Sequence, residues 1–133
     1  MIAFKEWSLV CDALGAGRQS IILRKGGIAE GRIGFSWKHD EFALFPTHFH
    51  EQQQALRGAE GIVLPPPDLT QHTVSLMAKV EFKTLLTDWA QIMALMPYHA
   101  WTEEILRERF DYTGERTISL AVLRVFRLAQ PLQ

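Results

Sequence analysis

The sequence predicts one α+β domain with a mostly antiparallel curved sheet, or a small barrel, and short helices. Residues 74–82 alternate between apolar and polar side chains, which is typical of a strand with one buried face. Residues 118–128 form a longer β-rich run that is largely apolar on both faces, as expected of a central strand. Between these strands, Thr87 or Asp88 and then Thr102 are suitable caps for two short helices.

The first half of the chain is expected to hold shorter elements. Apolar residues recur at three- and four-residue spacing over residues 3–14, ahead of Gly15, so this stretch predicts a helix. Residues 20–24 predict a buried strand, because they are rich in β-branched side chains and bounded by glycines. Residues 41–46 predict a strand that stops at its proline, and residues 51–56 predict a short helix.

Two connections are expected to lack regular structure. Glycines recur through residues 26–34, but the Lys-Ser/Thr ending of a phosphate-binding P-loop is absent from this stretch of the sequence. Three prolines at positions 65–67 fix an extended spacer, because proline lacks the N–H group that a central strand needs.

Length and composition indicate a folded, single-domain protein. The 133 residues suit one compact domain over residues 1–133, and 47% apolar with 22% charged residues is close to the globular average. The net charge of −1 excludes a global field that would attract nucleic acid or anionic membranes. Such binding therefore requires a local patch.

Cysteine usage and hydropathy favour a cytoplasmic location. Cys11 is the only cysteine, which excludes an internal disulfide and a thiolate metal cage and fits a reducing compartment. The first residues lack the order of a signal peptide, and no apolar run approaches the roughly 20 residues that span a bilayer. We therefore expect a cytoplasmic protein without a membrane partner, and no motif requires a cofactor.

The main functional signal is a basic stretch between residues 18 and 38. Its five cations stand against a single acid, Glu30, and are Arg18, Arg24, Lys25, Arg32 and Lys38. The glycines among them would let backbone N–H groups approach a phosphate, while the guanidinium groups make forked contacts to it. Trp7 and Trp37 would add stacking on a base. A solvated basic face, balanced by acids elsewhere, is the open alternative.

Two histidines beside a carboxylate form a second candidate site. His48 and His50 lie two positions apart, so on an extended segment both would point to the same side and reach one metal ion. Glu51 or His39 would be a third ligand. Imidazoles that bond to the backbone beside Pro46 explain the pair without a metal, and we favour this structural interpretation.

The remaining polar residues show no catalytic pattern. The sequence lacks the Gly-x-Ser-x-Gly of a nucleophile elbow, and it offers no triad. Four carboxylates lie along residues 103–111, where Arg107 and Arg109 make ordinary surface ion pairs the expected arrangement. The order Glu-Phe-Lys at residues 81–83 faintly resembles a restriction-nuclease strand, and we attribute it to chance.

Four segments, in chain order, resemble an uncharacterised-domain family numbered 1802: FKEWSLVCDALGAGRQSIILRKGGI, DEFALFPTHFHEQ, YHAWTEEILRERFDY and LRVFRL. The resemblance implies a bacterial or archaeal protein that occurs alone or joined to an Mrr-type endonuclease domain. It thereby implies a link with restriction-modification and an endonuclease partner, although this sequence does not contain the nuclease itself. The resemblance marks motif positions without assigning roles to them: Lys5, Glu6, Trp7, Arg24, Lys25, Gly26, Gly27, Pro46, Thr47, His50 and Gln52.

Residues 17–24 are similar to the Gly-x-Lys-x-x-Glu-x-Arg turn of the ASCH branch of PUA-like domains. Gly17 and Arg24 match that pattern, whereas Gln19 replaces its lysine and Ile22 its glutamate. This similarity implies a small PUA-like barrel that binds RNA or a modified base. The two replacements argue against the hydrolase chemistry of some ASCH proteins.

Together these signals predict a nucleic-acid-binding accessory module rather than an enzyme. In this hypothesis the five cations of residues 18–38 contact phosphates and Trp7 or Trp37 stacks on a base. Three further side chains add polar contacts, namely Thr47, His50 and Gln52. Two alternatives stay open: a metal-dependent hydrolase or nuclease that uses His48 and His50, and a protein-binding accessory subunit. DNA and RNA are both candidate partners.

Overall fold

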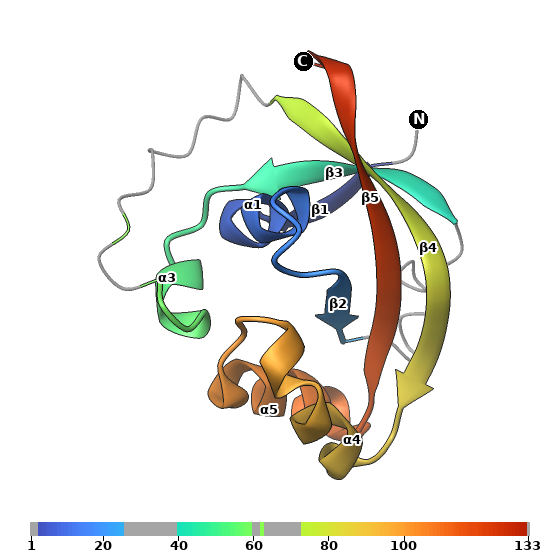
Figure 1. Cartoon of the computed structure of the whole chain (residues 1–133). Coiled ribbons are helices and arrows are strands. Elements are labelled where there is room, and N and C mark those ends of the chain that lie inside the picture. Colours follow the sequence, from blue (N-terminus) through green and yellow to red (C-terminus); the bar gives the residue numbers. More distant parts are fainter. Residues whose placement is uncertain (1–2, 26–39, 60–61, 63–72, 133) are drawn as a thin grey trace.

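Five strands form one curved, open sheet in the order β1-β3-β4-β5-β2 in the computed structural model (Figure 1). The structure describes residues 3–25, 40–59, 62 and 73–132, with the side chains of Thr113 and Leu132 left out. The strands are β1 (Ala3–Trp7), β2 (Ile21–Arg24), β3 (Glu41–Thr47), β4 (Val74–Leu86) and β5 (Ile118–Leu132). β1 and β3 run parallel, and the other pairs are antiparallel. The predicted α+β class with a mostly antiparallel curved sheet is therefore confirmed.

The long β4–β5 ladder is the backbone of the sheet. Val74, Leu76 and Ala78 are buried, as the alternation predicts, but Phe82 is 56% exposed, so the prediction of one buried face over residues 74–82 is wrong at its end. The pairing of β4 with β5 shifts between Val80 and Phe82, which marks a bulge or irregularity at that point of the ladder. β5 lies between β4 and β2, so the prediction of an inner strand is confirmed. Figure 1 shows both strands curving from the end near the C-terminus down to α4.

The first element differs from the helix predicted over residues 3–14. Residues 3–7 form β1, and the helix α1 starts only at Ser8 and covers Ser8–Gly15. β1 pairs in parallel with β3, with Phe4 opposite Leu44, and the ring centroid of Phe4 lies 5.2 Å from that of Phe42. The helical spacing of apolar residues is thus overridden by pairing with a strand about 40 residues further along the chain.

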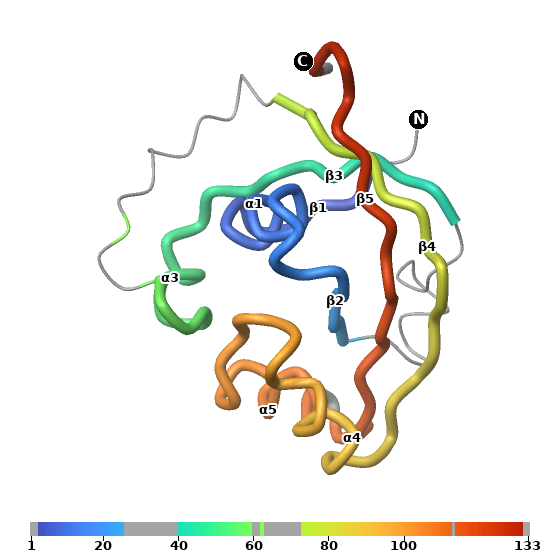
Figure 2. The backbone as a smooth tube through the Cα atoms, in the orientation of Figure 1, coloured from blue at the N-terminus to red at the C-terminus, as the bar shows by residue number. Residues whose placement is uncertain are grey.

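The remaining helices are short and lie within the curve of the sheet or close one end of it. They are α3 (Gln52–Ala55), α4 (Trp89–Ala94) and α5 (Glu103–Asp111), with the 3₁₀ turns η1 (Met96–Tyr98) and η2 (Tyr112–Gly114). Asp88 accepts a hydrogen bond from the N–H of Ala90, and Thr102 from that of Ile105, which confirms both caps. The backbone trace places α1 and β2 inside the curve, with α4 and α5 below them (Figure 2).

The core fills the space between the sheet and these helices. Ile22, Leu44, Trp101 and Leu106 are at most 1% exposed. No helix in the described part of the chain is long and apolar enough to cross a membrane. The loop predicted over residues 26–34 and the proline spacer at 65–67 lie outside the described residues.

Curvature brings the two edges of the sheet close together. β1 and β2 are its edge strands, yet the guanidinium group of Arg24 in β2 donates to the backbone carbonyl of Lys5 in β1 at 3.1 Å. The same guanidinium group lies 4.8 Å from the ring centroid of Phe4. The sheet therefore approaches a barrel that stays open along one seam.

Candidate functional site

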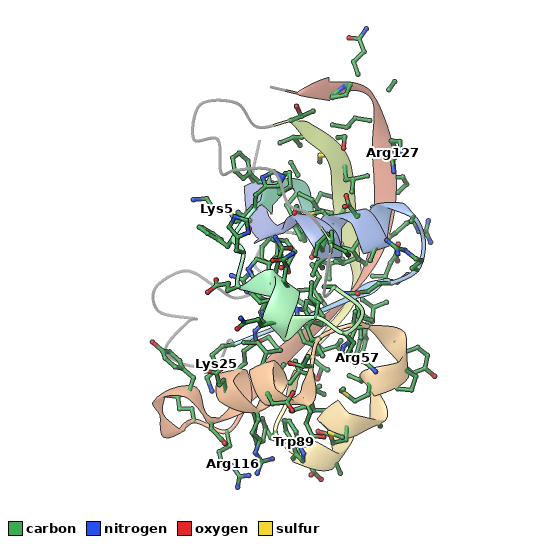
Figure 3. The ribbon with its side chains drawn as sticks, turned by 90° about the vertical axis from the view of Figure 1, so that its left-hand side faces the viewer. Lys5, Lys25, Arg57, Trp89, Arg116 and Arg127 are labelled. Carbon is green, nitrogen blue, oxygen red and sulfur yellow. The ribbon has the colours of Figure 1, made fainter. Side chains whose placement is uncertain are left out.

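A cleft of about 420 Å³ lies at the seam between the two sheet edges. β1 and β2, the segment after β3, and α5 with its following turn contribute its lining. These residues are Lys5, Glu6, Trp7, Arg24, Lys25, Thr47, Phe49, Glu51, Arg109 and Tyr112. Four cations face two carboxylates, so the lining carries excess positive charge. Figure 3 shows Lys5 and Lys25 on the same side of the molecule, with Lys25 next to α5.

Glu6 is the most unusual group in this cleft because its carboxylate is buried and only half hydrogen-bonded. The residue is 3% exposed, and its Oε1 accepts a hydrogen bond of 2.8 Å from the backbone N–H of Trp7. Oε2 has no hydrogen-bond partner among the described residues. Burial raises the pKa of Glu6, against the opposing effects of Arg24, the Trp7 N–H and Arg109. A buried, unpartnered oxygen in a cleft marks a position where a ligand can donate a hydrogen bond.

Arg109 forms an inner wall of the cleft. Its guanidinium group donates to the carbonyl of Leu23 at 2.7 Å and lies 5.3 Å from the ring centroids of both Trp7 and Trp101. Burial lowers the pKa of Arg109 to about 10, although the nearby charge of Glu6 raises it.

The expectation of surface pairing for Arg109 is therefore wrong, whereas Arg107 does pair with Asp111 at 3.5 Å on the surface. The reason lies in helical periodicity. Leu106 and Phe110 are the buried positions of α5, and Arg109 lies between them on the inward face.

Lys25 is a structural clamp. Its ammonium group donates to three backbone carbonyls, those of Phe110, Glu115 and Thr117. Because an ammonium group has three hydrogens, all of its donors are occupied. Burial lowers the pKa of Lys25, while Glu115 and Asp111 raise it. This placement argues against the predicted phosphate contact, since Lys25 instead holds the end of β2 to the segment between α5 and β5.

Thr47 lines the cleft, but Gln52 does not. The Thr47 hydroxyl donates to the carbonyl of Glu6 at 3.2 Å and so fixes the strand beneath the carboxylate. Gln52 is fully buried: its Oε1 accepts from the N–H of Leu9, and its Nε2 donates to the Ser8 hydroxyl and to the Thr47 carbonyl. Gln52 thus caps the start of α1, and the predicted ligand contact is replaced by this internal role.

The other predicted site residues do not converge on the cleft. Arg18 is exposed in the turn after α1, His48 is half-buried and His50 is exposed, and none of them belongs to the lining. Within the described ranges, no group of three or more His, Cys, Asp or Glu residues is placed to hold a metal ion. The remaining predicted residues lie outside the described ranges, namely Arg32, Trp37, Lys38 and His39.

A second cleft of about 500 Å³ adjoins the first and shares Trp7, Glu51 and Arg109 with it. Glu104 and Glu108 of α5 contribute further acids to its lining. The indole of Trp7 and the guanidinium group of Arg109 therefore belong to both clefts, one rich in cations and the other rich in acids.

The sequence did not predict a place in the binding site for Glu6, Lys5 or Arg109. Glu6 and Lys5 carry a signal only as positions of the family motif, because a carboxylate in an apolar stretch does not reveal whether it will be buried. For Arg109 the sequence held one weak indication: it follows Leu106 by three residues, a spacing that places both on the same face of a helix. Phe49 and Tyr112, which are 55% and 63% exposed, complete the aromatic lining and were also not predicted as site residues.

Comparisons with known proteins give the family and the fold. The sequence matches the domain of unknown function DUF1802 over residues 3–133, and a search of curated proteins gave no match. The crystal structure of ASCH from Zymomonas mobilis is similar with a TM-score of 0.57 and 13% identity, covering 98% of this chain and 69% of that one. A serine-to-alanine mutant of that protein gives a TM-score of 0.58 and 14% identity, covering 98% and 70%.

The residues that depart from the ASCH motif are internal in this structure. Gln19 is buried and donates to the carbonyl of Ile21 at 2.8 Å, and Ile22 is fully buried in the core. Neither residue lines the cleft, whereas Arg24, which matches the motif, lines it together with Glu6 and Arg109. This chain belongs to the DUF1802 family, and its fold is the PUA-like fold of ASCH proteins.

Proposed function

We propose that this domain binds single-stranded nucleic acid by holding one unpaired base in the cleft at the seam of the sheet. The observation that carries the proposal is the composition of one small cleft: cations, aromatic rings and a buried carboxylate with one oxygen that lacks a hydrogen-bond partner among the described residues. A volume of about 420 Å³ suits a ligand of nucleotide size and is too small for a duplex.

The aromatic lining supports stacking on a base. Trp7 is half-buried, and Phe49 and Tyr112 present much of their rings to solvent at the cleft. Stacking of a base on an aromatic side chain contributes about 1–3 kcal/mol, and it is insensitive to sequence because every base has a π-face. Such a lining favours an unpaired base over a paired one.

The cations support contacts to the backbone of the nucleic acid. Lys5 is exposed, and the guanidinium group of Arg24 lies at the same seam. Two phosphate contacts to a single strand would give log K a slope of about −1.4 against log salt concentration. Arg18 remains a candidate for a more distant phosphate, because it is exposed in the turn after α1.

The fold and the family add weaker support. A PUA-like fold agrees with the binding of RNA or of a modified base that the ASCH similarity implies, although a fold alone does not assign a function. The family resemblance adds a restriction-modification role, an endonuclease partner and a prokaryotic source to the proposal, and the composition of the sequence adds a cytoplasmic location. Co-purification of the chain with an endonuclease would test the partner.

Fluorescence anisotropy tests the proposal directly. Labelled single-stranded and duplex DNA and RNA are titrated across a salt series, with wild type, Lys5→Gln and the matched control Lys79→Gln. Lys79 is exposed on β4 and does not line the cleft, so it reports the effect of the charge alone. We expect Lys5→Gln to weaken single-strand binding about fivefold and to reduce the salt slope by about 0.7, with little effect of the control. Absence of single-strand binding at low salt, or equal losses in both variants, would contradict the proposal.

A further inference from the structure

We infer that Glu6 selects the base, so that the cleft takes bases with an exocyclic amino group, such as cytosine and adenine, in preference to uracil, thymine and hypoxanthine. This inference rests on the proposed function and names the chemical class of the base. It rests on three features of Glu6: its burial, one oxygen that accepts a hydrogen bond, and one buried oxygen without a partner among the described residues.

One oxygen of the Glu6 carboxylate lacks a hydrogen bond. Oε1 accepts from the N–H of Trp7 at 2.8 Å, whereas Oε2 is buried without a partner among the described residues, so Oε2 is the atom that a donor on a ligand in the cleft would satisfy. Arg24 and Arg109 favour the ionised form of Glu6 against the opposing effect of burial, and in that form the carboxylate only accepts hydrogen bonds. A buried acceptor without a donor costs about 1–3 kcal/mol. A ligand that brings an N–H group to Oε2 recovers this cost, whereas a ligand that brings a carbonyl oxygen increases it.

The bases differ in the hydrogen-bond donors and acceptors that they present along their edges. Cytosine and adenine present an amino group as the donor, and a carboxylate that accepts from the cytosine amino group is an established pairing. Uracil and hypoxanthine carry a carbonyl oxygen at the equivalent position. Uracil and hypoxanthine also have a ring N–H, but two carbonyl oxygens flank it in uracil and one lies beside it in hypoxanthine, so a carboxylate that accepts from it comes close to a carbonyl oxygen. Acceptors on the amino-bearing bases can face the cations of the cleft, among them Lys5 and Arg24.

The backbone that carries the Glu6 carboxylate is held by strand pairing and by two side chains. The backbone of Glu6 lies opposite Pro46 in the parallel β1–β3 pair, and its carbonyl accepts from the Thr47 hydroxyl at 3.2 Å. The same carbonyl lies 3.8 Å from the Sγ of Cys11, which is buried. These contacts fix the backbone from which the carboxylate extends, and the burial of Glu6 and the hydrogen bond from the Trp7 N–H restrict the side chain, so the carboxylate is pre-positioned to discriminate between ligands.

Four short single-stranded RNAs test the inference by anisotropy at neutral pH. Two hexamers consist of cytidine or of uridine, which differ only in the amino or carbonyl group of the ring. In the other two, adenosine is compared with inosine. We expect wild type to bind each amino-bearing strand about tenfold more tightly than its partner. In Glu6→Gln, an amide oxygen can still accept from Trp7 and an amide N–H₂ replaces Oε2, so we expect the preference to disappear or reverse.

The outcomes separate the inference from the proposed function. Equal, salt-dependent binding of both strands of each pair by wild type would overturn the inference and leave the function standing. A preference of the same size in wild type and in Glu6→Gln would also overturn it, because another group would then be the selector. Failure of wild type to bind any of the four strands would contradict the proposed function itself. The comparisons of cytidine with uridine and of adenosine with inosine need only the wild-type protein, so the inference can be overturned even if Glu6→Gln does not fold.

Discussion

Gln52 and Glu6 flank the start of helix α1, and both are buried polar side chains, but they differ in how fully they are hydrogen-bonded. Gln52 uses its oxygen on Leu9 and its amide nitrogen on Ser8 and Thr47, so its polar atoms are satisfied within the protein. Glu6 satisfies Oε1 and leaves Oε2 without a partner among the described residues. A satisfied buried group stabilises a fold, whereas an incompletely satisfied one in a cleft points to a ligand.

Replacement of Gln52 should have the largest effect on stability. Gln52→Leu removes the acceptor for the Leu9 N–H and the donor to Thr47, so we expect a loss of about 2–4 kcal/mol in the free energy of unfolding. Urea unfolding measures this loss. Gln54→Leu is the matched control, because Gln54 is exposed on the same helix and its replacement should stay within about 0.5 kcal/mol. A similar small change in both variants would refute the structural role of Gln52.

His99 is a third buried polar group and lies outside the cleft, and we expect it to make the free energy of unfolding depend on pH. Burial, and then the charges of Arg57 and Arg109, lower the pKa of His99 to about 4. Its Nδ1 accepts from the Trp101 N–H at 3.1 Å, which requires an unprotonated Nδ1.

The unfolded chain binds a proton near the ordinary pKa of about 6.5, so unfolding takes up protons between about pH 6.5 and 4. Stability should be fully present above this window and fall as the pH drops through it, by up to about 1.4 kcal/mol per pH unit. Urea midpoints from pH 4 to 7 measure the slope. We expect His99→Gln to flatten it and His50→Gln, at an exposed position, to preserve it. An unchanged slope in His99→Gln would show that other groups cause the pH dependence.

Lys25 is as fully hydrogen-bonded as Gln52, yet it lines the cleft together with Glu6. Lys25→Met removes the donor to three carbonyls, and we expect a loss of about 1–3 kcal/mol in the free energy of unfolding. The salt slope of binding by the folded variant should not change, because the ammonium group has no hydrogen left for a phosphate. Lys79→Met provides the control for stability. A reduced salt slope in Lys25→Met would restore Lys25 as a phosphate contact.

Glu6→Gln should have the smallest effect on stability, and it should leave the free energy of unfolding level or raise it, whereas Gln52→Leu and Lys25→Met lower it. Since burial raises the pKa of Glu6, the ionised carboxylate is less stable in the fold than in water, and a neutral amide of the same shape removes that cost. We expect the free energy of unfolding at pH 7 to stay level or rise by about 1 kcal/mol at most. A clear loss would show that Glu6 is held by the fold in the same way as Gln52.

Local signals account for the parts of the fold that were predicted. The alternation over residues 74–78 and the caps at Asp88 and Thr102 depend on neighbours a few residues away, and the structure confirms them, whereas Phe82, predicted on the same buried face, is 56% exposed. β1 could not be predicted in the same way, since its hydrogen bonds go to β3, about 40 residues along the chain. Pairing between distant segments is invisible to local periodicity.

The candidate site also combines features that the local sequence predicts with features that depend on distant contacts. Trp7, Arg24, Lys25 and Thr47 were predicted as site residues, and they do line one cleft. Their individual roles depend on which carbonyls and rings the fold brings near, so the clamp formed by Lys25 could not be inferred from a basic stretch. Arg109 was missed for a related reason, because an arginine among carboxylates usually indicates a solvated face.

The two arginines at the seam also bear on self-association. Arg24 occupies the carbonyl of Lys5 in one edge strand, and Arg109 occupies the carbonyl of Leu23 in the other. Exposed strand edges are templates on which a strand of another molecule can pair and start an aggregate. A guanidinium group bound to each edge removes one acceptor that such a strand needs and places a positive charge in its path. The seam can therefore stay open to a ligand while being protected against cross-molecular β-pairing.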